Sequence, residues 1–141
     1  MVEPAIHRIY VEHWQMQCCG APFSVGSTIE WNVHAVADRE YLAAVLGEDE
    51  AGRVTDAEDH HDVDERPSHL ARGVVRSIDA VFCEYAPRTA GSRELFVVPG
   101  TGVLEPRETA DGWEGREKVG AGRKFIGYLV NVDGAPRERE V

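Results

Sequence analysis

The stretch FSVGSTIEWNVHAV, residues 23–36, carries the pattern that decides the fold class. After a turn at Gly26 and Ser27, apolar residues stand at positions 29, 31, 33 and 35, and polar residues stand at 28, 30, 32 and 34. Alternation with a period of two is typical of a strand that buries one face. The stretch therefore predicts a half-buried strand over 28–35, with Trp31 as an anchor on its apolar face.

Four further segments predict strands and extend this pattern over most of the chain. Residues 6–17, 72–85, 93–98 and 124–132 are rich in β-branched and aromatic residues, and turn residues separate them. Five such strands predict a mainly β fold, a small antiparallel barrel or half-barrel of the SH3-like or OB-like type, because closure removes exposed sheet edges. A half-open α+β sheet is the alternative.

One segment predicts a helix and the next predicts a loop. In DREYLAAVLG, residues 38–47, Asp38 can cap the helix and Gly47 suits the left-handed position after its last turn. Between residues 48 and 65, the sequence has nine acidic residues and one basic residue, Arg53. This segment therefore contributes −8 of the net charge of −10. Because like charges repel and little there is apolar, we expect an acidic loop at 48–68.

Length and composition predict one domain in a reducing compartment. A chain of 141 residues is the size of a single domain, which we place at 1–135, followed by a polar tail at 136–141. The beginning of the chain shows neither the basic nor the apolar region of a secretion signal. Three cysteines, with no apolar run long enough to span a membrane, favour a cytoplasmic protein that binds no membrane. No cluster of Lys and Arg is present, so nucleic acid is not an expected partner.

The block WQMQCCGAPFSVG, residues 14–26, is unusual in composition. It resembles an uncharacterised family of small actinobacterial proteins that carry a similar Trp-Gln-x-Gln-Cys-Cys-Gly-x-Pro-Phe block near the N-terminus. The resemblance implies no activity and no catalytic residue. It indicates only that residues 14–26 are a signature of the family.

Cysteine and histidine residues form the first candidate site. Cys18 and Cys19 stand beside a turn, and His60, His61 and His69 are the side chains that could complete a zinc site with them. Zinc motifs usually contain two spaced ligand pairs, and this sequence lacks the second pair. The spacing therefore favours one buried and one free thiol over a metal centre, so no cofactor is expected, with zinc as the alternative.

Aromatic residues form the second candidate site, because they exceed what one core layer needs. Some of them could line a barrel mouth and stack on a planar ligand or on a Pro-rich segment of a partner. The candidates for ligand binding are Trp14, Trp31, Trp113 and Tyr128, with Tyr10 and Tyr85 in the same aromatic set.

The sequence favours a binding module over an enzyme. It contains no nucleophile elbow, phosphate-binding Gly loop or metalloprotease motif. The main hypothesis is a non-catalytic accessory module for a protein or small-molecule ligand. The alternative is a metal-binding or thiol-dependent protein centred on the cysteines and histidines above.

Overall fold

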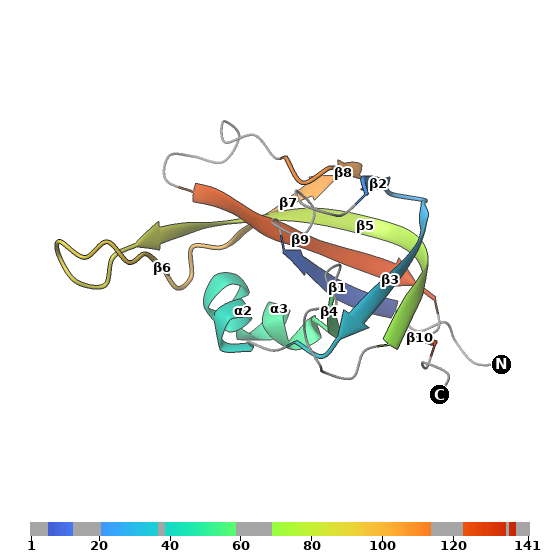
Figure 1. Ribbon diagram of the computed structural model, residues 1–141, viewed down its shortest axis with the longest axis horizontal. Helices are drawn as coiled ribbons and strands as arrows, with labels where there is room; N and C mark the ends of the chain where they lie inside the picture. Colours follow the sequence, from blue (N-terminus) through green and yellow to red (C-terminus); the bar gives the residue numbers. More distant parts are fainter. Residues whose placement is uncertain are drawn as a thin grey trace.

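The computed structural model describes residues 6–12, 21–36, 39–58, 69–113, 123–134 and 136–137. Strands dominate these residues, and two short helices accompany them (Figure 1). The elements are β1 (Ile6–Glu12), β2 (Phe23–Ser24), β3 (Thr28–His34), α2 (Arg39–Leu46), α3 (Glu48–Arg53), β4 (Asp56–Glu58), β5 (His69–Ala86), β6 (Phe96–Val97), β7 (Val103–Arg107), β8 (Thr109–Ala110), β9 (Arg123–Asp133) and β10 (Pro136–Arg137).

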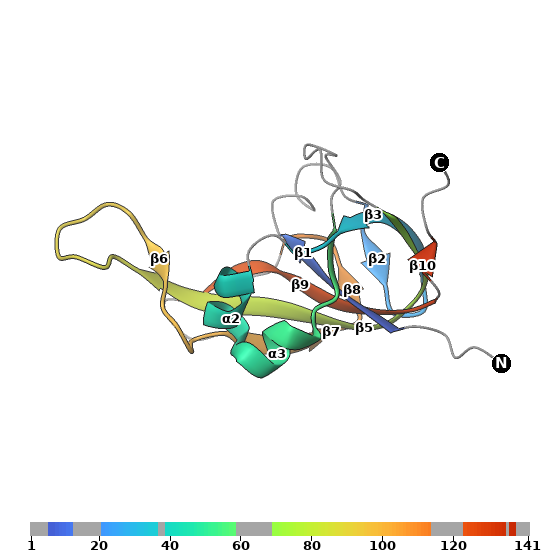
Figure 2. The same ribbon diagram turned by 90° about the horizontal axis from the view of Figure 1, so that it is seen from below.

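Five strands are hydrogen-bonded in a ring, in the order β1, β4, β3, β5, β9 and back to β1 (Figure 2). The β1–β4 pair is parallel and the other pairs of the ring are antiparallel. The mainly β class and the closed arrangement are confirmed. The sheet is mixed rather than purely antiparallel, because the chain passes through both helices before β4 lies beside β1. The arrangement is ring-like and not formally a barrel.

Strand β5 organises the sheet, because its 18 residues pair with five other strands. Its register with β9 shifts between Val75 and Ser77. A bulge of this kind reverses which side chains face the core. Strict alternation would place Val75 on the face of Val81 and Cys83, but the bulge brings Val75 into the inner core with Ile78.

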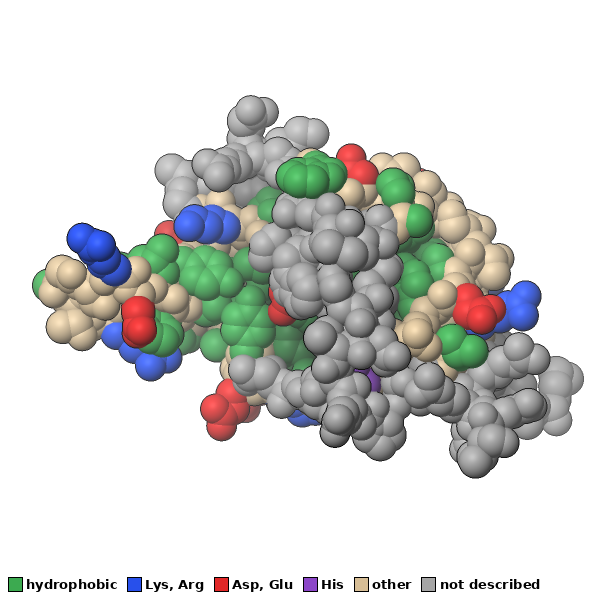
Figure 3. All heavy atoms as spheres, viewed as in Figure 1, with side chains coloured by type: hydrophobic (Ala, Val, Ile, Leu, Met, Phe, Trp, Pro, Cys, Tyr) green, Lys and Arg blue, Asp and Glu red, His purple; other side chains and the backbone are tan. Residues whose placement is uncertain are grey.

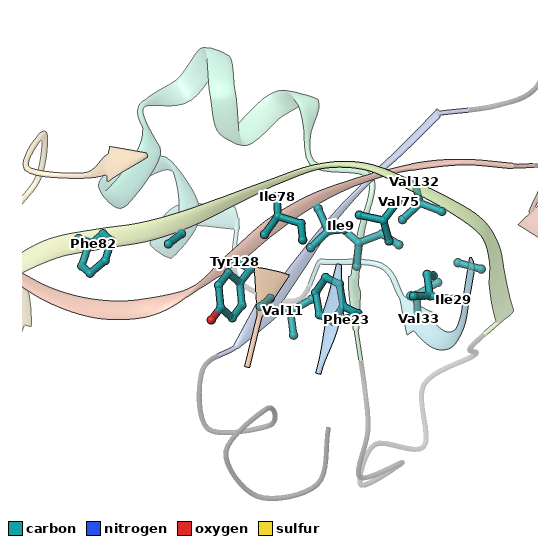
Figure 4. Close-up of a cluster of buried hydrophobic side chains, with 14 residues drawn as sticks. Ile9, Val11, Phe23, Ile29, Val33, Val75, Ile78, Phe82, Tyr128 and Val132 are labelled. Carbon is teal, nitrogen blue, oxygen red and sulfur yellow. The ribbon is translucent and has the colours of Figure 1, made fainter. Parts of the chain in front are cut away.

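The core has two parts, one on each face of the sheet. The inner cluster faces into the ring (Figure 4) and comprises Ile9, Val11, Phe23, Ile29, Val33, Ala71, Val75, Ile78, Ala80, Phe82, Ala110, Tyr128, Val130 and Val132. The outer cluster lies between the sheet and the helices and comprises Tyr10, Leu42, Val45, Ala51, Val54, Val81, Cys83, Ile126 and Leu129. The outer cluster fixes the position of α2.

Helix α2 confirms the helix predicted over 38–47. Leu42 and Val45 are buried against the outer face of the sheet, as their spacing along the helix requires. Gly47 ends the helix with φ +87°, and its amide donates to the Ala43 carbonyl at 2.9 Å. Its ψ of 157° is extended, so this is not the left-handed helical cap; the positive φ, which glycine adopts without strain, directs the chain straight into α3.

The acidic loop predicted for 48–68 is wrong over residues 48–58, which form α3 and β4. Two apolar residues in the charged run, Ala51 and Val54, are buried in the outer cluster. Arg39 donates to both of their carbonyl oxygens at 3.2 Å. Arg8 pairs with Glu50 at 2.8 Å, so part of the negative charge is neutralised by the sheet. Residues 59–68 lie outside the described residues.

Three other boundaries differ from the sequence-based prediction. The strand expected over 93–98 is reduced to β6, and the weakly patterned stretch 100–122 contains β7 and β8. The tail expected from residue 136 begins with β10, which pairs with Leu70 and Ala71 of β5. Pairing with a long neighbouring strand supplies the order that the local sequence does not indicate.

Candidate functional site

A cavity of about 440 Å³ lies between α2, the end of β5 and the segment that carries β6. Figures 1 and 2 show β5 and β6 extending together beyond the ring, with α2 beside the base of this arm. The cavity is lined by Glu40, Tyr41, Ala44, Tyr85, Arg88, Leu95, Phe96, Val97 and Pro99. Its wall combines apolar and aromatic side chains with two tyrosine hydroxyls and the charged groups of Glu40 and Arg88.

Backbone contacts hold the arm against α2. The amide of Gly100 donates to the Ala44 carbonyl at 3.0 Å, and the amide of Val98 donates to the Glu84 carbonyl at 2.8 Å. At Gly102, a side chain would collide with the backbone oxygen of Val45. A glycine at this position lets the chain that returns from the arm approach α2 closely.

Three tyrosines from three elements meet at the inner end of the cavity. The hydroxyl groups of Tyr41 on α2 and Tyr85 on β5 are hydrogen-bonded at 3.1 Å. Tyr10 on β1 lies behind them and interacts with the Tyr41 hydroxyl, and its own hydroxyl donates to the Ile126 carbonyl at 3.3 Å. Glu12, two residues further along β1, hydrogen-bonds with Tyr10. We call Tyr10, Glu12, Tyr41 and Tyr85 the hydroxyl cluster.

Burial changes the acidity of this cluster. Desolvation raises the pKa of Glu12 to about 7, and the hydrogen bond from Tyr10 opposes part of that rise. Desolvation also raises the pKa of Tyr10 and of Tyr41, and the nearby carboxyl of Glu12 adds to both shifts. The pKa of Cys83 is raised by burial, which makes this thiol a poor nucleophile. Near neutral pH, Glu12 is therefore the member of the cluster that exchanges a proton.

Charged groups surround the mouth of the cavity. The guanidinium of Arg88 lies over the Phe96 ring, 3.9 Å from its centroid, and Glu40 lies across from them on α2. Lys124 Nζ lies 5.9 Å from the centroid of the Tyr85 ring. Figure 3 shows hydrophobic side chains gathered on this face around the base of the arm. Leu95, which directly precedes β6 in the arm, is 50% exposed. The mouth therefore combines an apolar surface with charges of both signs.

A second polar pair is buried in the ring. His7 Nδ1 lies 3.2 Å from Asp56 Oδ2, which also accepts a hydrogen bond from the Thr55 hydroxyl at 2.8 Å. The contact joins β1 to β4, the strand that completes the ring. We assign it a structural role, because it ties a 3-residue strand to its neighbour.

Of the aromatic residues proposed from the sequence, Trp31 and Tyr128 both pack on Phe23, and Trp113 follows Gly112, whose amide donates to the Tyr128 hydroxyl; that these residues bind a ligand stays a prediction. Tyr128 is fully buried between Phe23 and Phe125, and Trp113 is 68% exposed. Trp31 is half-buried and packs edge-to-face on Phe23 with a centroid separation of 4.9 Å, on the face predicted for it. Trp14 lies outside the described residues. From the wider aromatic set, Tyr85 lines the cavity and Tyr10 lies behind it.

The proposed metal ligands are for the most part not described. Cys18, Cys19, His60 and His61 lie outside the described residues, and His69 is described only as the first residue of β5. Within the part of the chain that the structure describes, no group of three or more His, Cys, Asp or Glu side chains could hold a metal ion. The metal hypothesis stays untested.

Sequence reasoning missed Tyr41, Phe96 and Glu12 as site residues. Tyr41 belongs to the apolar stripe of a helix, which indicates a core position, and Glu12 is one polar residue in an alternating strand. No local signal joins these residues, because β1, α2 and the β5–β6 arm meet only in the folded sheet. A long strand that continues past the ring is the one feature that could have indicated the arm.

Residues 5–134 match the model of DUF6578, a family of unknown function. The chain belongs to this family. No curated protein and no solved structure matches it. Membership agrees with the resemblance stated above at the level of an uncharacterised family, and the signature block and an actinobacterial origin stay predictions. Neither helix described here has the length or the hydrophobicity to cross a membrane.

Proposed function

We propose that this member of DUF6578 is a non-catalytic binding module that holds a small organic ligand in the cavity between α2 and the β5–β6 arm. The observation that supports it most directly is the aromatic wall formed by Tyr41, Tyr85 and Phe96 around about 440 Å³. That volume falls within the range of roughly 300–1,000 Å³ found for small-molecule sites. A cytoplasmic location, and the absence of membrane or nucleic-acid partners, are part of the proposal.

The composition of the wall favours a small ligand over a protein partner. A concave site of this volume has room for a small molecule, whereas a protein interface needs about 800 Å² on each partner. Within the described residues, the exposed large hydrophobic side chains near the cavity are confined to Leu95. We therefore infer a flat, largely apolar ligand that stacks on the rings and hydrogen-bonds to the tyrosine hydroxyls.

Removing the Phe96 ring should weaken binding. We expect Phe96→Ala to lower the affinity for small-molecule fragments that bind the wild-type protein by roughly tenfold or more. The variant loses both the buried area of the ring and a stacking contact, which contributes about 1 kcal/mol beyond burial. Affinity is measured by ligand-observed NMR titration. Trp113→Ala is the matched control, since it removes a large exposed ring elsewhere. Equal loss in both variants, or none in Phe96→Ala, would reject the cavity as the binding site.

A further inference from the structure

Arg88 is the cationic side chain in the described lining of the cavity, and an aromatic ring orients it. Arg88 follows the last residue of β5, Ala86, which pairs with Phe96 at the start of β6. The guanidinium carbon of Arg88 lies 3.9 Å from the centroid of the Phe96 ring, and both residues line the cavity. Contact with the ring covers one face of the planar guanidinium and leaves the N–H groups at its edge available to other partners. Phe96 therefore positions the cation without using its hydrogen bonds.

The guanidinium of Arg88 has no polar partner among the residues that the structure describes. Most of the other described arginines do have one. Five of them pair with a carboxylate, namely Arg8, Arg53, Arg72, Arg76 and Arg107. Arg39 and Arg123 donate to backbone carbonyl oxygens instead. In a protein with 25 acidic and 15 basic residues, the arginine that lines the cavity has thus kept its N–H groups free for an anionic group from elsewhere.

The other polar groups of the wall tolerate a single negative charge placed beside Arg88. Burial raises the pKa of Tyr41 and of Tyr85, so both phenols are neutral near pH 7 and neither repels an anion. Glu40 stands in the first turn of α2, where the helix dipole stabilises a carboxylate. Its charge lies on the α2 side of the cavity and opposes a second negative charge on the ligand. The wall therefore fits one negative charge on the side of the arm.

We propose that the ligand is a flat monocarboxylic acid whose carboxylate pairs with Arg88 and whose apolar body lies against the tyrosine rings. This inference rests on the proposed function, because it requires the cavity to hold a ligand. The edge of a guanidinium presents two parallel N–H groups, which match the two oxygens of a carboxylate. A volume of about 440 Å³ has room for an aromatic ring with a short acidic side chain.

The test compares three probes of nearly the same size and shape on the full-length protein. At about pH 7.5, trans-cinnamate carries a carboxylate, cinnamamide is neutral and cinnamylamine is a cation. We expect cinnamate to bind about three- to tenfold more tightly than either of the other two, because a two-pronged ion pair in a partly solvated site contributes a modest gain. Added salt should reduce this preference, since it screens the pair. Affinities come from NMR titration of the Tyr41 and Tyr85 ring resonances.

Two arginines of the arm provide a matched pair of variants. Arg88→Gln removes the cation that lines the cavity, so this variant should bind cinnamate no more tightly than cinnamamide. Arg93→Gln removes the same charge from the same arm but outside the described lining of the cavity, so it should keep the preference of the wild type. Both side chains are exposed, so neither substitution should unfold the protein. Arg88→Lys keeps the charge without the planar fork and should keep only part of the preference.

Each outcome decides between the two proposals. Equal affinity of the three probes at the cavity, or tightest binding of cinnamylamine, overturns the pairing with Arg88 and leaves the binding function standing. An unchanged preference in Arg88→Gln, or an equal loss in Arg88→Gln and Arg93→Gln, does the same. Absence of binding by all three probes overturns the binding function and the pairing with it. A preference for cinnamate that disappears in Arg88→Gln and persists in Arg93→Gln supports both.

Discussion

Replacement of Tyr128 by Ala should leave little folded protein. The ring is fully buried in the inner cluster, in edge-to-face contact with Phe125 at 4.9 Å and with Phe23 at 6.3 Å between centroids. Truncation of a buried aromatic residue costs about 3–5 kcal/mol, which is a large share of the ~5–15 kcal/mol that stabilises a domain. Urea unfolding followed by circular dichroism measures the effect.

Two control variants show how much of the expected loss of stability comes from the Tyr128 hydroxyl and how much follows from removing any large ring. Tyr128→Phe removes the hydroxyl, which accepts a hydrogen bond from the Gly112 amide at 3.0 Å, and should cost about 1 kcal/mol. Trp113→Ala removes an exposed ring and should change stability by less than about 0.5 kcal/mol. Near-native stability of Tyr128→Ala would show that the inner cluster is not the core of the ring.

Replacement of Glu12 by Gln should stabilise the protein above neutral pH. Burial raises the pKa of this half-buried carboxyl from 4.5 to about 7, so the folded state binds the proton more tightly than the unfolded state does. The contribution of Glu12 to stability is therefore highest below about pH 4.5, falls as the pH rises to about 7, and is lost above that. A shift of this size corresponds to about 3 kcal/mol at most.

The comparison of wild type with Glu12→Gln at each pH removes the effect of all other titrating groups. We expect the difference in unfolding free energy to be small near pH 4 and to grow in favour of the variant up to about pH 7, with a plateau beyond it. Urea midpoints across this range provide the measurement. A constant difference would mean that Glu12 titrates with an ordinary pKa and that the hydroxyl cluster is solvated.

Strands with one buried face could be predicted from local pattern, because burial imposes a period of two. Ile29 and Val33 are buried as the alternation indicates, and Trp31 packs on the same face. The bulge after Val75 could not be predicted, because it depends on the register with β9. Local pattern gives the elements, whereas pairing between distant strands decides which faces they bury.

The order of residues 48–58 could not be predicted, because acidic residues dominate this part of the sequence. In the acidic segment, Ala51 and Val54 are buried in the outer cluster, but the neighbouring carboxylates dominate the composition. Arg39 on α2 donates to the carbonyl oxygens of both residues, and Arg8 on β1 pairs with the neighbouring Glu50. A repulsive segment can therefore be ordered by cations that lie far away in the sequence.

The candidate site was the least predictable part of the molecule. Tyr85 belonged to the aromatic set singled out in the sequence, but its partner Tyr41 is 44 residues away and was assigned to a helix core. Phe96 joins them only because β6 folds back on the end of β5. The site is built from the arm, whose position depends on contacts with α2 that leave no trace in the spacing of residues.

The most direct test of the account is to locate bound fragments on protein labelled in its tyrosine and tryptophan rings. We predict that fragments perturb the NMR resonances of Tyr41 and Tyr85, which line the cavity, and leave those of Trp113 unchanged. Tyr128, enclosed in the inner cluster, should also be unaffected. Perturbation centred on Trp113, or no perturbation of Tyr41 and Tyr85 by any fragment that binds, would contradict a ligand site between α2 and the arm.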